Sequence, residues 1–96
     1  MPYIKQSDKA RIKPQLEKIL MADKGQLCYA ISELMLTFAR QHLINKKPDY
    51  QLLSDCRAAA LDASYEWQDR IMRSYENHKI RENGDVFQDF IREVNI

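Results

Sequence analysis

Apolar residues recur along this chain at the three- and four-residue spacing of helical faces, and this pattern predicts an all-α protein. The pattern is widest in residues 25–44, where Leu36 and Cys28 extend a broad stripe formed by Leu27, Ala30, Ile31, Leu34, Met35, Phe38, Ala39 and His42. A helix that is apolar over so much of its surface packs against neighbours on more than one side. We therefore expect residues 25–44 to form the central helix of the fold.

A long helix is predicted at about residues 50–82, because the segment from Tyr50 to Asn83 contains neither Gly nor Pro. At about 1.5 Å rise per residue, this helix is roughly 50 Å long. Asp49 is a suitable N-cap, and Asn83-Gly84 is a stop signal because glycine readily adopts the left-handed conformation that ends helices. The first half is rich in alanine, which favours close packing against the central helix.

The two ends of the chain complete the predicted fold. Residues 1–24 form an N-terminal segment and a short helix, with Ser7-Asp8 as its N-cap and a break before Pro14. Residues 85–96 form a short amphipathic tail helix that Asp85 caps. We expect a single domain over residues 1–96, built as a small three-helix bundle with one long C-terminal helix.

Self-association follows from a mismatch in length. The long helix outruns the two shorter helices that cover it, and its second half carries large side chains. We expect a dimer, with the partner surface formed by Trp67, Ile71, Met72, Tyr75 and Lys79. The alternative is that residues 1–12 or the tail 86–96 fold back over this surface.

Charge and composition limit the cellular compartment and the classes of partner that we expect. The net charge of +1 does not indicate nucleic-acid binding, and acidic residues interrupt the basic and aromatic residues of the long helix. The charge is uneven, since residues 1–24 are basic and residues 82–96 are acidic. Cys28 and Cys56 lie among apolar residues, which favours buried free thiols in a reducing compartment. Neither a leader nor a membrane-spanning run is present, so we expect a cytoplasmic protein.

The search for catalytic chemistry centres on three carboxylates that share a face of the long helix, namely Asp62, Glu66 and Asp69. All-α nucleotide pyrophosphohydrolases of the MazG type hold magnesium between two such acidic helices. Here the facing helix offers only Glu33, and Glu66 and Asp69 each have an arginine four residues later as an ion-pair partner. The potential metal ligands His42, His78, Cys28 and Cys56 are scattered. We therefore expect no catalytic residue, metal or cofactor.

Three segments resemble one family: Met1–Lys5, Gly25–Ile31 and Tyr75–Phe87, the last with the pattern YExxKIxENGDV. The family is a domain of unknown function that occurs in small, uncharacterised helical proteins of bacteriophages and bacteria. This chain departs from it at Cys28, at Phe87 and in its longer tail. The resemblance implies phage or prophage origin and action inside a bacterial cell, but it supplies no active site.

The sequence leaves several functions open. The first is a non-enzymatic interaction protein that modulates a bacterial host enzyme or defence complex. The second is an oligomeric binder of small molecules such as nucleotide signals; a MazG-like enzyme and a nucleic-acid binder come after these. The turn at Asn83, Gly84 and Asp85 is a candidate binding site, although it equally fits a helix cap that holds the tail.

Overall fold

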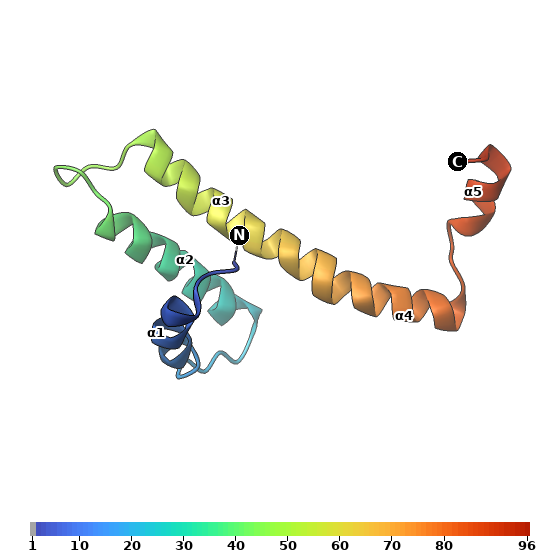
Figure 1. The fold of residues 1–96 in the computed structure, drawn as a ribbon, viewed down its shortest axis with the longest axis horizontal. Helices are drawn as coiled ribbons and strands as arrows, with labels where there is room; N and C mark the ends of the chain where they lie inside the picture. The colour runs from blue at the N-terminus through green and yellow to red at the C-terminus, as the bar shows by residue number, and fades with distance from the viewer. Residues whose placement is uncertain (1) are drawn as a thin grey trace. The chain divides into compact units, whose positions relative to one another are not determined.

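The computed structural model of this protein describes residues 2–96 and is helical throughout its regular structure (Figure 1). Two compact units divide the chain, one ending at Ala63 and the other spanning Ser64–Ile96. The elements in chain order are α1 (Gln6–Leu16), α2 (Lys24–Gln41), α3 (Tyr50–Trp67), η1 (Gln68–Met72), α4 (Arg73–Asn83) and α5 (Gln88–Val94). The prediction of an all-α chain is thus confirmed.

The predicted long helix is also confirmed, because α3, η1 and α4 follow one another without a break over 34 residues. Its start is fixed by Asp49, whose side chain accepts a hydrogen bond of 2.8 Å from the backbone N–H of Leu52. The sequence did not reveal η1, a five-residue π-helical segment. In such a segment the backbone hydrogen bonds span five residues instead of four, which shifts the direction of the side chains that follow.

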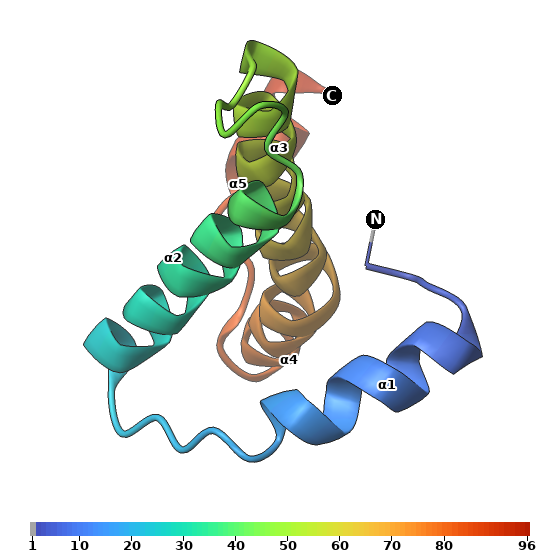
Figure 2. The ribbon, with the colours of Figure 1, turned by 90° about the vertical axis from the view of Figure 1, so that its left-hand side faces the viewer.

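In the first unit, α2 and the first part of α3 lie side by side and are joined by residues 42–49 (Figures 1 and 2). The connection closes tightly because Ile44 and Lys47 exchange two backbone hydrogen bonds of 3.1 Å each. Asn45 and Lys46 between them adopt positive φ angles of 53° and 61°. These angles are typical of a two-residue turn that reverses the chain.

The contact between α2 and α3 is the most buried part of the described chain. Leu52 and Cys56 on α3 are each only 8% exposed. The Cys56 thiol donates a long hydrogen bond, 3.8 Å, to the backbone carbonyl of Met35 on α2. Ala59, Ala60 and Ala63 line an apolar groove of about 320 Å³ with side chains of α2. The alanine-rich half of the long helix therefore packs against α2, as predicted.

In the second unit, α4 ends at Gly84 and the chain turns into α5. Gly84 has φ +92° and ψ 157°, and its N–H donates a 2.8 Å hydrogen bond to the carbonyl of Ile80. The positive φ was predicted, but the ψ angle is extended and not left-handed helical. Asp85 accepts a hydrogen bond of 2.9 Å from the N–H of Phe87, which fixes the turn before the tail helix.

Two predictions about α1 are wrong. The helix starts at Gln6 after Lys5, with no side-chain cap, and Asp8 lies in its first turn. It also runs through Pro14 without a break. Pro14 lies in the last turn of α1 and has no N–H to donate to the carbonyl of Ala10, so the helix forms without this hydrogen bond.

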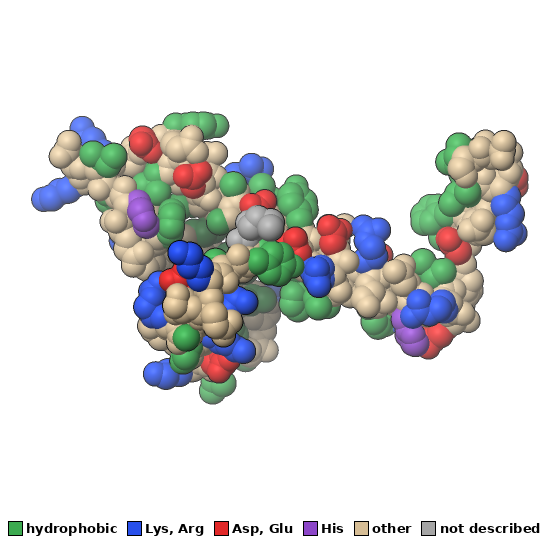
Figure 3. Space-filling view, viewed as in Figure 1, with side chains coloured by type: hydrophobic (Ala, Val, Ile, Leu, Met, Phe, Trp, Pro, Cys, Tyr) green, Lys and Arg blue, Asp and Glu red, His purple; other side chains and the backbone are tan. Residues whose placement is uncertain are grey.

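Exposed apolar side chains are the other general feature of the described residues. Figure 3 shows hydrophobic side chains at the surface of both units. They include most of the large apolar residues of α2, and Cys28, predicted to be buried, is exposed as well. None of the helices described combines the length and apolarity that crossing a membrane requires.

Candidate functional site

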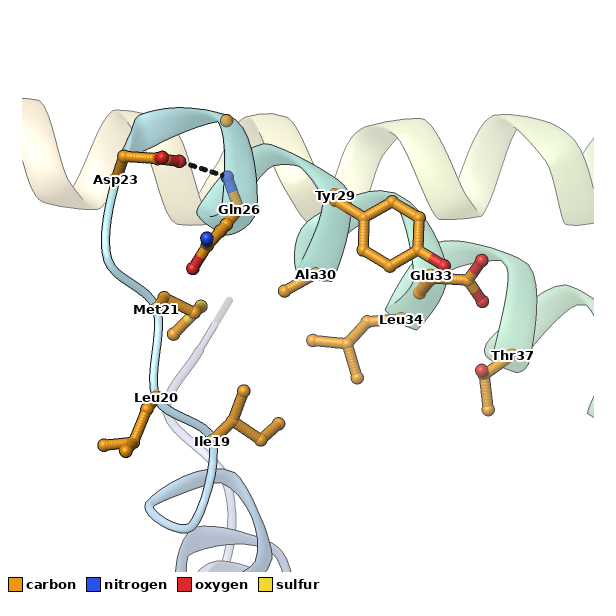
Figure 4. Close-up of a pocket in the computed structure, with 11 residues that line it drawn as sticks. Ile19, Leu20, Met21, Asp23, Gln26, Tyr29, Ala30, Glu33, Leu34 and Thr37 are labelled. Carbon is orange, nitrogen blue, oxygen red and sulfur yellow. Dashed lines mark hydrogen bonds between the residues drawn. The ribbon is translucent and has the colours of Figure 1, made fainter.

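An apolar groove of about 630 Å³, called the α2 groove below, runs along α2 in the first unit. One wall is the connection between α1 and α2, and the other is α2, whose Leu34 also lines the groove shared with α3. Figure 4 shows Ile19 and Met21 of the connection opposite Ala30 and Leu34 of α2. The residues that line the groove are Ile19, Leu20, Met21, Asp23, Gly25, Gln26, Tyr29, Ala30, Glu33, Leu34 and Thr37.

A reciprocal capping arrangement holds the two walls together. Asp23 is the N-cap of α2, and its carboxylate accepts a 2.8 Å hydrogen bond from the N–H of Gln26. The Gln26 side chain in turn accepts a 2.7 Å bond from the N–H of Ala22. The arrangement resembles a capping box, except that the side chain of Gln26 accepts from Ala22 and not from the N–H of the N-cap Asp23. It ties the connecting segment to the first turn of α2 and so positions Met21 beside the groove.

The polar groups of the α2 groove are acidic or neutral. Its described lining includes the carboxylates of Asp23 and Glu33 but no Lys, Arg or His. Asp23 is engaged as the helix cap, whereas Glu33 is half-buried and forms no hydrogen bond or ion pair with the described residues. An apolar groove with one available carboxylate suits an apolar group that carries a positive charge, since a buried charge needs a partner.

The predicted partner surface lies in the second unit and begins at the last residue of α3. Its four large side chains are about half exposed or more: Trp67 61%, Ile71 53%, Met72 47% and Tyr75 63%. Ile71 and Met72 belong to η1, and π-helical segments occur frequently at functional sites. Lys79 lies 5.7 Å from the centre of the Tyr75 ring and forms a 3.2 Å ion pair with Glu82. The predicted residues are thus exposed in the second unit.

The predicted turn site is part of a groove in the same unit. This groove has a volume of about 350 Å³ and combines the end of α4 with the turn that follows. It is lined by Tyr75, Glu76, Lys79, Ile80, Asn83, Gly84, Asp85, Val86 and Phe87. Because Asp85 is occupied with the backbone of Phe87, its first role here is structural.

The acidic residues of the long helix do not gather into a metal site. Asp69 pairs with Arg73 at 3.5 Å, the i,i+4 pair that the sequence predicts. His78 contacts Glu82 at 2.9 Å in the same way. Across residues 2–96, no group of three or more His, Cys, Asp or Glu side chains is placed to hold a metal ion. Asp62 and Glu66 also make contacts within the chain.

Sequence reasoning missed the α2 groove, because one of its walls is an irregular segment without helical periodicity. The available signal was the spacing of Asp23 and Gln26 directly before an apolar helix, which is typical of a capping box. Apolar residues just before that box, Ile19 to Met21, then have to lie near the first turns of the helix. The predicted breadth of the α2 stripe is the second signal.

Comparison with known proteins gives one family. Residues 1–86 match the family described as Domain of unknown function (DUF6899). Neither a curated protein nor a solved structure matches the chain. The match covers the α2 groove, the surface around η1 and the turn at Asn83–Asp85, but it excludes α5.

Proposed function

Since this chain belongs to a family that is itself a domain of unknown function, we propose a function from its surfaces: a non-enzymatic, homo-oligomeric protein that acts by binding another protein. The observation that supports this proposal is the exposure of large apolar side chains along both units. Among the described residues only Leu52 and Cys56 are buried. Soluble proteins that expose contiguous apolar surface use it for association.

The first part of this proposal concerns the predicted partner surface, called the surface around η1. Fully burying a large apolar side chain contributes roughly 1.5–3 kcal/mol. Trp67, Ile71, Met72 and Tyr75 are about half exposed. Covering their exposed parts therefore contributes roughly 3–6 kcal/mol per protomer. A twofold dimer gains this twice, which is comparable with the roughly 4–15 kcal/mol that association costs. In the dimer, packing between protomers completes the helical bundle.

The target is a bacterial protein, such as a host enzyme or a defence complex, and the protein is of phage or prophage origin. The resemblance to proteins of bacteriophages and bacteria supports this part of the proposal. Binding of nucleotide signals between subunits is the alternative function. The α2 groove does not favour it, because phosphate groups need cations and the described lining of the groove has none.

Two measurements test the proposal. Light scattering on the purified protein at micromolar concentration should give twice the 11.4 kDa mass of the chain. Ile71→Glu should dissociate the dimer without loss of helical circular dichroism, whereas Asn77→Glu should leave it intact. Asn77 is the matched control because it adds the same charge on another side of the helix.

The second measurement is affinity capture from a bacterial lysate with the wild type, Ile71→Glu and Asn77→Glu. A bacterial protein retained at stoichiometric level by the wild type and Asn77→Glu supports the proposed function. A monomeric wild type that retains no protein contradicts it. Nucleotide released from the purified protein, detected by its ultraviolet absorbance, would instead support the alternative.

A further inference from the structure

Helix α1 carries basic and apolar side chains on the same face. In a helix, residues three or four positions apart share a face. This spacing joins Ile12 and Leu16, and it places Lys9 and Lys13 beside them, with Lys5 at the N-cap just before α1. Both apolar side chains are exposed, and α1 has no buried residue. Isolated helices shorter than about 12–15 residues are marginally stable in water. An 11-residue helix that also contains Pro14 therefore needs a packing partner.

The α2 groove has the complementary chemistry. It is apolar, and its available charged group is the half-buried carboxylate of Glu33. A partner that fills the groove removes water from this carboxylate. An apolar partner without a cation would leave a buried, unpaired charge, which is strongly unfavourable. The groove therefore selects a helix that brings a positive charge together with its apolar side chains.

The connection between α1 and α2 hinders α1 of the same chain from entering this groove. Only residues 17–23 separate α1 from α2, and Ile19, Leu20 and Met21 within them form a wall of the groove. If α1 folded back into the groove, its own connection would have to leave the wall. The capping bonds between Ala22, Asp23 and Gln26 oppose this movement. A second copy supplies the same helix without disturbing the wall.

From this charge complementarity we infer that α1 of one copy docks into the α2 groove of a second copy. Ile12 and Leu16 are the apolar anchors, and Lys9 is the cation that pairs with Glu33. Lys9 is the best candidate because Lys13 already contacts Glu17 at 3.7 Å. In a twofold dimer the contact occurs twice. The inference rests on the proposed self-association. It gives the dimer a second contact, in addition to the one formed by the surface around η1.

Exchange of charges between copies tests this contact. Glu33→Lys and Lys9→Glu should each raise the dissociation constant of the dimer at least about tenfold, because each homodimer then contains two like-charged pairs. An equimolar mixture of the two variants should regain the wild-type constant. That mixed dimer contains one original pair and one reversed pair. The measurement is sedimentation velocity over a concentration series at constant ionic strength.

Arg11→Glu is the matched control. It makes the same change of charge on α1, but Arg11 lies on the opposite side from Lys9 and pairs with Asp8 at 3.8 Å. It should leave the dissociation constant within about twofold of the wild type. Circular dichroism of every variant checks that helix content is retained. The inference is wrong if the mixture stays as weak as the single variants, or if Lys9→Glu and Arg11→Glu behave alike.

Other outcomes separate this inference from the proposed function. A wild-type dimer that Ile71→Glu dissociates but the charge exchanges do not alter overturns the α1 contact and leaves the proposed function standing. A monomeric wild type overturns both. If the double variant Glu33→Lys with Lys9→Glu restores thermal stability that each single change lowers, and no dissociation constant changes, the occupant is α1 of the same chain. That result also overturns the inference.

Discussion

Replacement of Gly84 by alanine should destabilise the protein through backbone strain alone. Gly84 has φ +92° and ψ 157°, a region that is essentially restricted to glycine. Holding another residue there costs on the order of 1–3 kcal/mol. A Cβ atom at this position would meet no atom within 4 Å, so collision with neighbours adds nothing. Alanine also lowers the entropy of the unfolded chain, an opposing effect of about 0.4–1 kcal/mol. The net loss should be roughly 1–2 kcal/mol.

The assay is urea unfolding followed by circular dichroism at one protein concentration, because association shifts the apparent stability. Hydrogen exchange of the Gly84 amide, which donates to the Ile80 carbonyl, reports the same loss locally. Gly25→Ala is the control. Gly25 lies in the first turn of α2 without a positive φ, and its added Cβ would lie 3.3 Å from the Asp23 carboxylate. The gain in helix propensity, up to roughly 1 kcal/mol, is offset because the capping carboxylate of Asp23 has to shift, so the change should be close to neutral.

Gly84→Asn separates two explanations of the helix end. Asparagine tolerates the left-handed helical conformation, so it would be nearly harmless if Gly84 ended α4 in that conformation. The observed ψ of 157° is extended, so asparagine should cost as much as alanine. An asparagine variant as stable as the wild type, or an alanine variant without loss, would refute the reasoning.

Three further predictions concern the structure of the first unit. Asp49→Ala removes the cap of α3 and should cost about 0.5–2 kcal/mol in urea unfolding, whereas Asp49→Ser should retain most of the stability. Leu52→Ala should cost about 2–5 kcal/mol because Leu52 is buried, and Leu53→Ala, at a 53% exposed position, should cost much less. Cys28 should react with a thiol reagent in the folded protein, and Cys56 only after unfolding. Equal reaction rates of the two thiols would contradict the buried contact between α2 and α3.

The positions of the helices followed from local signals that the sequence states directly. The side chain of Asp49 accepts a hydrogen bond at the start of the long helix, and Gly84 ends it with a positive φ. Both features depend only on residues close by in the sequence, so the sequence predicts them. Pro14 misled the prediction. Proline removes one hydrogen bond to the preceding turn, and this local cost does not by itself decide whether the helix breaks there.

The candidate sites were less predictable because they depend on distant contacts. Periodicity indicated that α2 is apolar on several sides, but it did not tell which side faces α3. Cys28 and Cys56 have similar neighbours in sequence. Cys56 on α3 lies in the contact between α2 and α3 and is buried, whereas Cys28 on α2 is exposed. The π-helical turn of η1 has no simple sequence signal either, and it lies in the middle of a segment that reads as ordinary helix.

In the proposed function, the two exposed surfaces would select partners by different physical means. The surface around η1 presents Trp67, Ile71, Met72 and Tyr75, whose association depends on shape and apolar area and discriminates little by charge. The α2 groove contains Glu33, whose desolvation penalises every partner that lacks a cation at that point. Specificity requires such a penalty for the wrong partner as well as attraction for the right one. If the proposed association holds, the carboxylate in the groove is the group that would restrict which partners the apolar groove accepts.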